Sequence, residues 1–240
     1  TAVFSTLKEL REFKGVSPER IAGIAVTGQR ASVLGLDAAD RPVGAAISWQ
    51  DMRGGEELDR LRTSISDEEY YRITGLPLNP VFSLAKILRI KEREPERFRR
   101  ISRFVLISGF ILNHLGTRDY FCDYSNASLT GLFDVDSLAW SRKLLCLTGI
   151  GEDQLPLLVP SGRVVGKLSA SAAAETGLAE GTLLISGGGD QQCAALGAGA
   201  VESGVAAINM GTAAVTVCSL NAPLRDSKRR LPCCAHVMDD

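Results

Sequence analysis

The 240-residue chain has little of what several classes of protein depend on. It contains 2 histidines and 6 cysteines, and their spacing fits no zinc-binding pattern, so we expect no metal cluster. Lysine and arginine total 27 against 28 acidic residues, so no excess of charge predicts a nucleic-acid or membrane partner. No apolar run is long enough to span a membrane, and no signal peptide opens the chain. These absences predict a globular protein of the cytoplasm.

The cysteines are expected to be reduced thiols, as is usual in cytosolic proteins. Three of them lie in apolar runs and are predicted to be buried in the core: Cys146, Cys193 and Cys218. The adjacent pair Cys233 and Cys234 has no assigned role.

Strand and helix patterns alternate along the chain. Short apolar runs predict strands over residues 21–26, 31–37, 45–49, 103–108, 182–186, 205–210 and 213–219. Helical spacing predicts one helix over residues 2–13, two within 53–74, and one that begins at a cap formed by Ser83. Further helices are predicted over 109–115, ending at Leu115, and over 136–148. The last two are predicted over 169–177, with Gly177 as the C-terminal cap, and from about residue 190. The first three strands have short connections and are expected to be antiparallel neighbours. The chain is therefore predicted to be α/β, a mixed sheet flanked by helices.

The segment ISGGGDQQCAALGAGA, residues 185–200, places three glycines and an aspartate after an apolar strand. Gly187, Gly188 and Gly189 are expected to form a tight turn that a ligand can approach closely. Asp190 would then begin a helix, whose dipole favours a charged carboxylate. A carboxylate at the edge of a sheet can accept a proton from a substrate hydroxyl. On spacing alone, the alternative that Asp190 only caps the helix stays open.

Two further clusters are candidates for ligand binding. In INMGTAAV, Gly211 and Thr212 lie between two predicted strands, where backbone N–H groups and a hydroxyl can meet a phosphate; an ordinary hairpin turn is the alternative. Polar groups also gather beside an aromatic ring in TGQRAS and SWQDMR, as a sugar or polyol site requires; a solvated surface turn is the alternative. The residues of this early cluster are Gln29, Arg30, Trp49, Gln50, Asp51 and Arg53.

Five segments occur in the order found in the FGGY carbohydrate kinases: AVTGQRASVLGLD, AAISWQDMR, CDYSNASLTGLFDV, GGGDQQCAALGAG and NMGTAA. Over nearly its whole length the chain resembles the N-terminal domain of this family, which includes glycerol, xylulose and other polyol or ketose kinases. The resemblance implies an actin-like, ribonuclease-H-like domain. It also implies ATP-dependent phosphorylation of a sugar hydroxyl, with ATP and Mg²⁺ as cofactors and a sugar or polyol as substrate. A homodimer is left open.

By position, Asp190 resembles the catalytic base of the family. The residues that resemble its substrate pocket are Gln29, Arg30, Trp49, Asp190 and Gln191. Gly211 and Thr212 resemble the hairpin that meets the ATP phosphates. In such a transfer, positioning and charge neutralisation do most of the work, so a well-placed weak base suffices.

Two parts of the family pattern are not found in the sequence. The Asp-x-Gly-Thr phosphate hairpin should precede Thr1, and the second, ATP-binding domain should follow Asp240. Residues 1–240 are therefore expected to be the N-terminal, sugar-binding domain, truncated at both ends and inactive alone. A non-catalytic sugar-binding or interaction module is the main alternative, and another actin-fold ATPase is a third.

The substrate is predicted to be larger than glycerol. Glycerol kinases hold their substrate with an Arg-Glu pair and a Tyr, and the matching positions here resemble Arg30–Ala31 and Val81. Two polar contacts are thus replaced by small apolar groups, which disfavours a site built for glycerol. A pentulose such as xylulose, or a longer polyol, is expected instead.

Overall fold

The fold is that of a computed structural model, which describes residues 2–10, 12, 16–210 and 214–238. Its α-helices are, in chain order, α1 (Ala2–Leu10), α2 (Gly55–Leu61), α3 (Asp67–Thr74), α4 (Ser83–Arg93), α5 (Pro95–Arg100), α6 (Ile107–Leu115), α7 (Tyr124–Ser128), α8 (Arg142–Thr148), α9 (Ala170–Thr176) and α10 (Asp190–Gly197). Short 3₁₀ helices occupy Pro18–Arg20 and Glu152–Gln154. Over the described ranges, none of the helices has the length and apolar character needed to cross a membrane.

The central sheet has the strand order β1–β9–β8, with β1 parallel and β8 antiparallel to β9. Elsewhere in the described part, β2 pairs with β3, β5 with β6 and β10 with β11 in antiparallel fashion, and β4 runs parallel to β7. The strands are β1 (Gly23–Gly28), β2 (Val33–Leu36), β3 (Arg103–Leu106), β4 (Phe121–Asp123), β5 (Phe133–Asp134), β6 (Ala139–Trp140), β7 (Leu157–Val159), β8 (Val164–Lys167), β9 (Leu183–Gly189), β10 (Ala206–Met210) and β11 (Ala214–Cys218). This arrangement confirms the predicted α/β class with a mixed sheet.

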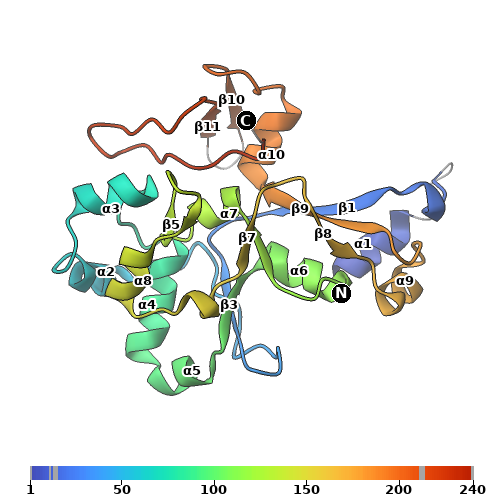
Figure 1. Cartoon of the computed structure of the whole chain (residues 1–240), viewed down its shortest axis with the longest axis horizontal. Helices are drawn as coiled ribbons and strands as arrows, with labels where there is room; N and C mark the ends of the chain where they lie inside the picture. Colours follow the sequence, from blue (N-terminus) through green and yellow to red (C-terminus); the bar gives the residue numbers. More distant parts are fainter. Residues whose placement is uncertain (1, 11, 13–15, 211–213, 239–240) are drawn as a thin grey trace.

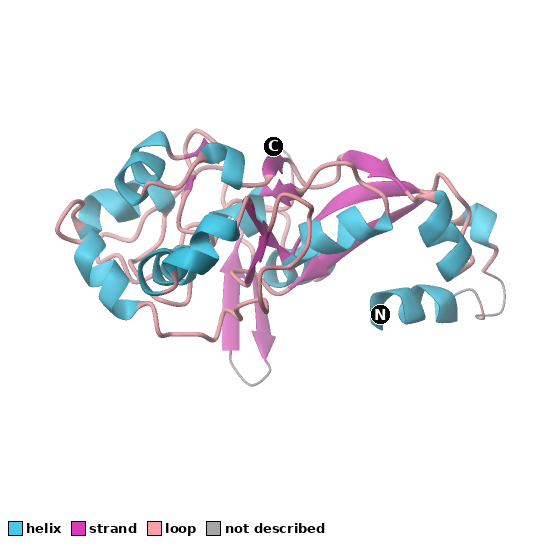
Figure 2. Ribbon diagram, turned by 90° about the horizontal axis from the view of Figure 1, so that it is seen from below, coloured by secondary structure: helices cyan, strands magenta, loops and turns pink. Residues whose placement is uncertain are grey.

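The two larger of three clusters of buried apolar side chains in the described residues hold most of these elements together. The larger one includes Leu58, Ile87 and Phe104, from α2, α4 and β3. The second joins the central sheet to α6 and α9 through residues such as Leu115 and Leu184. Figure 1 shows α2, α3, α4, α5 and α8 on one side of the molecule and the central sheet with α1, α6 and α9 on the other. The carboxyl ends of β1 and β9 point between these two groups, and the β10–β11 hairpin stands out from the body (Figures 1 and 2).

The predicted antiparallel pairing of the first three strands was wrong for the first pair and is confirmed only as a short bridge for the second. β1 pairs with β9, and β2 pairs with β3 and not with β1. The chain changes direction between β1 and β2 at Ala31, which has a φ of 62° in the left-handed region. The predicted third strand, 45–49, is reduced to an antiparallel bridge between Ile47 and Val33.

Two local predictions were also wrong. Residues 136–148 do not form one helix, because Leu138 adopts a φ of 52° in the turn between β5 and β6, and α8 begins only after Ser141. Ser83 does not cap α4, which begins after Phe82; the Ser83 hydroxyl donates to the carbonyl of Ala31 at 3.2 Å. By contrast, Gly177 ends α9 in the left-handed region, as predicted.

The cysteines follow the sequence prediction in part. All six are free thiols. Cys146 and Cys218 are exposed and Cys193 is half-buried, so the prediction that these three are core residues was wrong. The strands and helices that carry them turn those positions outward, whereas Cys122 in β4 is buried, which raises the pKa of its thiol.

Candidate functional site

The candidate site lies at the carboxyl edge of the parallel pair β1 and β9. In the register of this pair, Gly28 lies opposite Gly189. Gln29 and Arg30 therefore leave the end of β1 beside Asp190, which follows the end of β9. Ligands of α/β proteins gather at this kind of edge, where parallel strands end together.

Asp190 is the first residue of α10, and its side chain is exposed. Gly189, with φ −64° and ψ 144°, occupies the cap position, so Asp190 is not the N-cap. One carboxylate oxygen of Asp190 accepts the backbone N–H of Gln191 at 2.9 Å. Its other oxygen has no partner among the hydrogen bonds of the described residues. An exposed carboxylate held at a helix N-terminus can accept a further hydrogen bond from a ligand.

The three glycines do not form the tight turn that the sequence predicted. They are the last residues of β9, and none of the three has a positive φ. Each lies where another part of the protein comes too close for a side chain. A Cβ on Gly187 would lie 1.9 Å from the Val26 carbonyl oxygen, one on Gly188 2.2 Å from Val237 Cγ1, and one on Gly189 2.2 Å from Arg30 Cδ.

Arg30 packs along the strand end that carries Asp190. Its aliphatic stem lies against Gly189, and its Nη1 donates to the Ser125 carbonyl at 3.4 Å. The thiol of Cys234 also lies beside Arg30; burial raises the pKa of this thiol, and the guanidinium acts in the opposite direction. After Arg30, Ala31 adopts a left-handed backbone conformation, and the chain then continues into β2. The structure therefore brings Arg30, Asp190 and, by sequence adjacency, Gln29 and Gln191 together.

Trp49 is tied to this region through its backbone. The Ser32 hydroxyl, two residues after Arg30, accepts the Trp49 N–H at 3.0 Å. Trp49 is 39% exposed, so part of its ring is open to a ligand. Gln29 is exposed as well.

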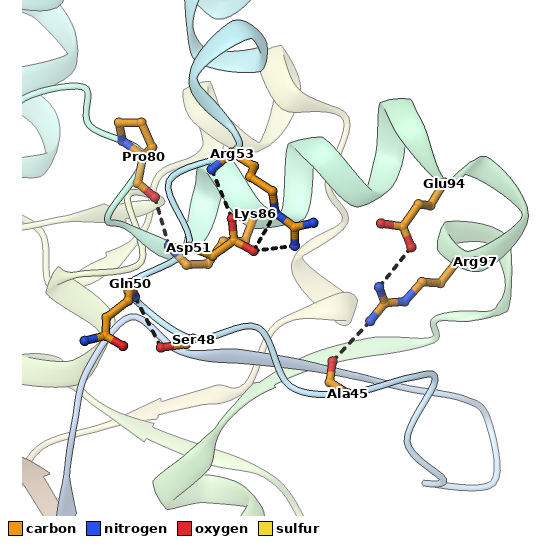
Figure 3. Close-up of polar contacts among 9 residues, drawn as sticks. All are labelled: Ala45, Ser48, Gln50, Asp51, Arg53, Pro80, Lys86, Glu94 and Arg97. Atoms are coloured by element: carbon orange, nitrogen blue, oxygen red, sulfur yellow. Dashed lines mark hydrogen bonds and ion pairs between the residues drawn. The ribbon is translucent and has the colours of Figure 1, made fainter.

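The loop after Trp49 contains an ion pair between two of its own residues, Asp51 and Arg53 (Figure 3). The Arg53 guanidinium donates to both carboxylate oxygens of Asp51, with Nε 3.0 Å from each, and this contact lowers the Asp51 pKa to about 2. Arg53 is exposed, as is Gln50, whose N–H is accepted by the Ser48 hydroxyl at 3.2 Å. For Gln50 and Arg53, this geometry fits the alternative of a solvated surface turn.

Lys86 anchors the neighbouring loop from within the core (Figure 3). Its Nζ donates to the carbonyls of Pro80 and Val81, each at 2.9 Å, and to that of Phe82 at 3.3 Å. The residue is 2% exposed, and burial lowers its pKa to about 8, against a smaller opposing effect of Asp51. Lys86 thus fixes the backbone around Val81, a predicted pocket position.

The predicted phosphate-binding pair, Gly211 and Thr212, lies outside the described residues. The strands on either side are described, and Met210 pairs with Ala214. The hairpin meets the Asp190 helix where Asn209 Nδ2 donates to Gln191 Oε1 at 3.3 Å. A shallow cavity lies between α10 and the two strands.

Sequence reasoning missed a buried polar cluster under the end of β9. Asp123, Ser125 and Asn126 are each at most 5% exposed, and the Ser125 hydroxyl accepts the Gly189 N–H at 2.9 Å. Their segment was part of the family resemblance but received no role. Sequence reasoning also missed the stretch from Cys233 to Val237, which crosses β9 at Gly188; no pattern in the sequence predicts that contact.

Comparison with known proteins identifies the family. The model for the FGGY family of carbohydrate kinases, N-terminal domain, matches residues 1–197. The chain belongs to this family. It is 32% identical over 225 residues to the xylulose kinase of Bacillus subtilis (strain 168), covering 94% of the chain and 45% of that protein. It is 29% identical over 217 residues to the gluconokinase of the same strain, covering 90% of the chain and 42% of that protein.

Solved structures agree with this assignment. A xylulose kinase from Rhodospirillum rubrum superposes with a TM-score of 0.90 at 30% identity, covering 97% of the chain and 47% of that protein. A gluconate kinase from Lactobacillus acidophilus gives 0.88 at 25% identity, covering 95% and 46%. The predicted actin-like fold is thereby confirmed. The FGGY chain spans about half the length of these relatives.

Proposed function

We propose that this chain is the sugar-binding half of an ATP-dependent carbohydrate kinase and carries its catalytic base, Asp190. The observation that supports the proposal most is the register of β1 and β9, which sets Gly28 opposite Gly189. Arg30 and the exposed carboxylate of Asp190 therefore share one edge. Membership of the FGGY family supplies the reaction class.

The residues at this edge suit a polyhydroxylated substrate. Gln29, Arg30 and Gln191 offer amide and guanidinium groups to hydroxyls, and the open part of the Trp49 ring offers a flat face to C–H bonds. Asp190 accepts the proton of the attacking hydroxyl and orients its oxygen. In a loose phosphoryl-transfer transition state, this orientation matters more than the strength of the base.

The nucleotide is proposed to be ATP with Mg²⁺. When bound, ATP would supply the phosphoryl group and Mg²⁺ would neutralise the charge that develops on it. Mg²⁺ is usually held by one or two carboxylates together with phosphates and waters. In the described ranges no group of three or more His, Cys, Asp or Glu side chains forms a dedicated metal cage, so the ion would be held mainly by the phosphates of ATP and by water. Gly211 and Thr212 are proposed to meet the phosphates.

Substitution of Asp190 tests the proposed base. In the product of the complete reading frame that contains this chain, Asp190→Asn should lower kcat by about 10²- to 10⁴-fold with a modest change in KM. The amide keeps the size of the side chain but cannot take up the proton. Steady-state kinetics with a sugar panel measures this effect. Asp153→Asn, which alters an exposed carboxylate in the 3₁₀ helix Glu152–Gln154, is the control and should behave as the wild type.

Near wild-type turnover by Asp190→Asn would reject Asp190 as the base. If the wild-type protein binds sugar but never transfers phosphate, the chain is a binding module and the kinase proposal fails.

The substrate is proposed to be a pentulose or another linear sugar derivative longer than glycerol. Ala31 is 2% exposed and Val81 is half-buried, so neither position offers a polar group to a small triol. We expect kcat/KM for xylulose, ribulose, a pentitol or gluconate to exceed that for glycerol by about 100-fold or more. If glycerol is the best substrate in this panel, the interpretation of Ala31 and Val81 is wrong.

A further inference from the structure

The segment CDYSNAS, residues 122–128, packs beneath the candidate site. Asp123 ends β4 and caps α7, and Ser125 and Asn126 lie in the first turn of that helix. Ser125 is fully buried and Asn126 is 1% exposed. Polar side chains this deep in a protein are costly unless each finds a partner. The partners of this cluster therefore show what it does.

The carboxylate of Asp123 is satisfied by neutral donors. It accepts the Asn126 N–H at 3.0 Å, the Asn126 side-chain amide at 2.6 Å, and the hydroxyl of Ser125. An ionised carboxylate only accepts hydrogen bonds, so it fixes the direction of the Ser125 hydroxyl proton. The oxygen of Ser125 is thereby left as an acceptor that points away from Asp123.

The hydroxyl oxygen of Ser125 accepts a hydrogen bond from the last residue of β9. The Gly189 N–H donates to Ser125 Oγ at 2.9 Å, one residue before Asp190. The backbone carbonyl of Ser125 accepts Arg30 Nη1, and the stem of Arg30 packs on Gly189. Ser125 therefore contacts Arg30, which follows β1, and Gly189, which ends β9 just before Asp190.

We propose that Ser125, oriented by Asp123, is a positioning residue that holds Gly189 and Arg30 in register so that Asp190 faces the substrate. This inference rests on the proposed kinase function. Because Gly189 is the cap of α10, loosening its N–H lets the first turn of the helix move, and with it the carboxylate. A displacement of about 1 Å at a reacting group can cost about 100-fold in rate.

The experiment uses Ser125→Ala, which removes the hydroxyl, and Asp123→Asn, which keeps the size of the cap but can donate to Ser125. The matched control is Thr148→Val, which removes a buried hydroxyl in α8 that donates to the Leu144 carbonyl at 2.7 Å. Amide hydrogen exchange at Gly189 is measured by NMR on the 240-residue chain. Steady-state kinetics is measured on the product of the complete reading frame.

We expect Gly189 to exchange about ten-fold faster in Ser125→Ala and Asp123→Asn, the order expected for loss of one hydrogen bond, and as in the wild type in Thr148→Val. We expect kcat to fall about 10- to 100-fold in the first two variants, with little change in KM for ATP, and to stay unchanged in Thr148→Val. Ser125→Thr, which keeps the hydroxyl, should restore part of the loss.

Unchanged exchange at Gly189, or faster exchange with unchanged kcat, would overturn the positioning role. If Ser125→Ala fails to fold, Asp123→Asn decides the question by the same two measurements. Absence of phosphorylation by the wild type would instead overturn the proposed function, and the exchange data would still report whether Ser125 holds Gly189.

Discussion

Gly187 lies in β9 at a point where the backbone of β1 leaves no room for a side chain. A Cβ at this position would meet the backbone of Val26, at 1.9 Å from its oxygen and 2.6 Å from its carbonyl carbon. The register of the pair shifts between Ala25 and Thr27, which lie opposite Ile185 and Gly188, so β9 has one residue more than β1 at this point. Because these are backbone atoms, no side-chain rotation can relieve the contact.

We therefore predict that Gly187→Ala lowers the free energy of unfolding by about 1–3 kcal/mol, as overpacking in a core does. Gly197→Ala is the control, since a Cβ there has open space around it at the end of α10. That variant should be neutral or more stable by up to about 1 kcal/mol. Urea denaturation of the 240-residue chain measures both. Equal stability of the two variants would contradict the role assigned to the β1–β9 contact.

At the scale of single residues, the sequence could predict where Asp190 lies but not which residues surround it. Asp190 begins a helix after a strand, as predicted, because a carboxylate between a strand and a helix is a local pattern. The prediction of a tight turn at the three glycines was wrong, because the residues that require glycine there, such as Val26 and Val237, come from distant parts of the chain. Ser125 was missed for the same reason, since its partner Gly189 is 64 residues away.

At the scale of elements, Lys86 joins α4 to the loop that carries Val81. Its pKa is lowered from an ordinary value of 10.5 to about 8, mainly by burial. Between these two values the unfolded chain binds a proton that the folded chain does not. The free energy of unfolding should therefore rise with pH from about 8 to about 10.5 through Lys86.

The Lys86→Met variant tests this expectation. Its unfolding free energy should rise less steeply than that of the wild type over pH 8 to 10.5, because it lacks the group that titrates. Denaturant titrations at several pH values measure both slopes. Their difference isolates Lys86, since both proteins share the other titrating groups. Parallel pH profiles would show that the buried amine does not titrate in this range.

Element boundaries could be predicted where the signal is local, as for α9, which Gly177 ends in the left-handed region. Pairing could not, because β1 finds its parallel partner in β9, about 160 residues later in the chain. The helix expected over 136–148 fails because Trp140 belongs to a two-residue strand, with its indole N–H donating to the Pro156 carbonyl at 3.0 Å. Tertiary contacts of this kind override a helical pattern of apolar residues.

At the scale of the whole molecule, the FGGY chain carries the proposed sugar site and spans about half the length of its relatives. Phosphoryl transfer also needs a held nucleotide and exclusion of water by closure around it. In β10, Ile208 is 66% exposed and Met210 is 82% exposed. Large exposed apolar side chains on alternate positions, and so on one face, of a strand commonly mark an interaction surface.

We predict that the 240-residue chain alone binds its sugar and transfers no phosphate from ATP. Trp49 is partly exposed and Trp140 is buried, so sugar binding should change the fluorescence of Trp49, and Trp49→Phe should remove that signal. Sugar-dependent ADP formation measures transfer, with the product of the complete reading frame as the positive control. ATP-dependent sugar phosphate formation by the 240-residue chain would contradict the prediction. It would mean that the edge holding Arg30 and Asp190 assembles a complete phosphate site without a second domain.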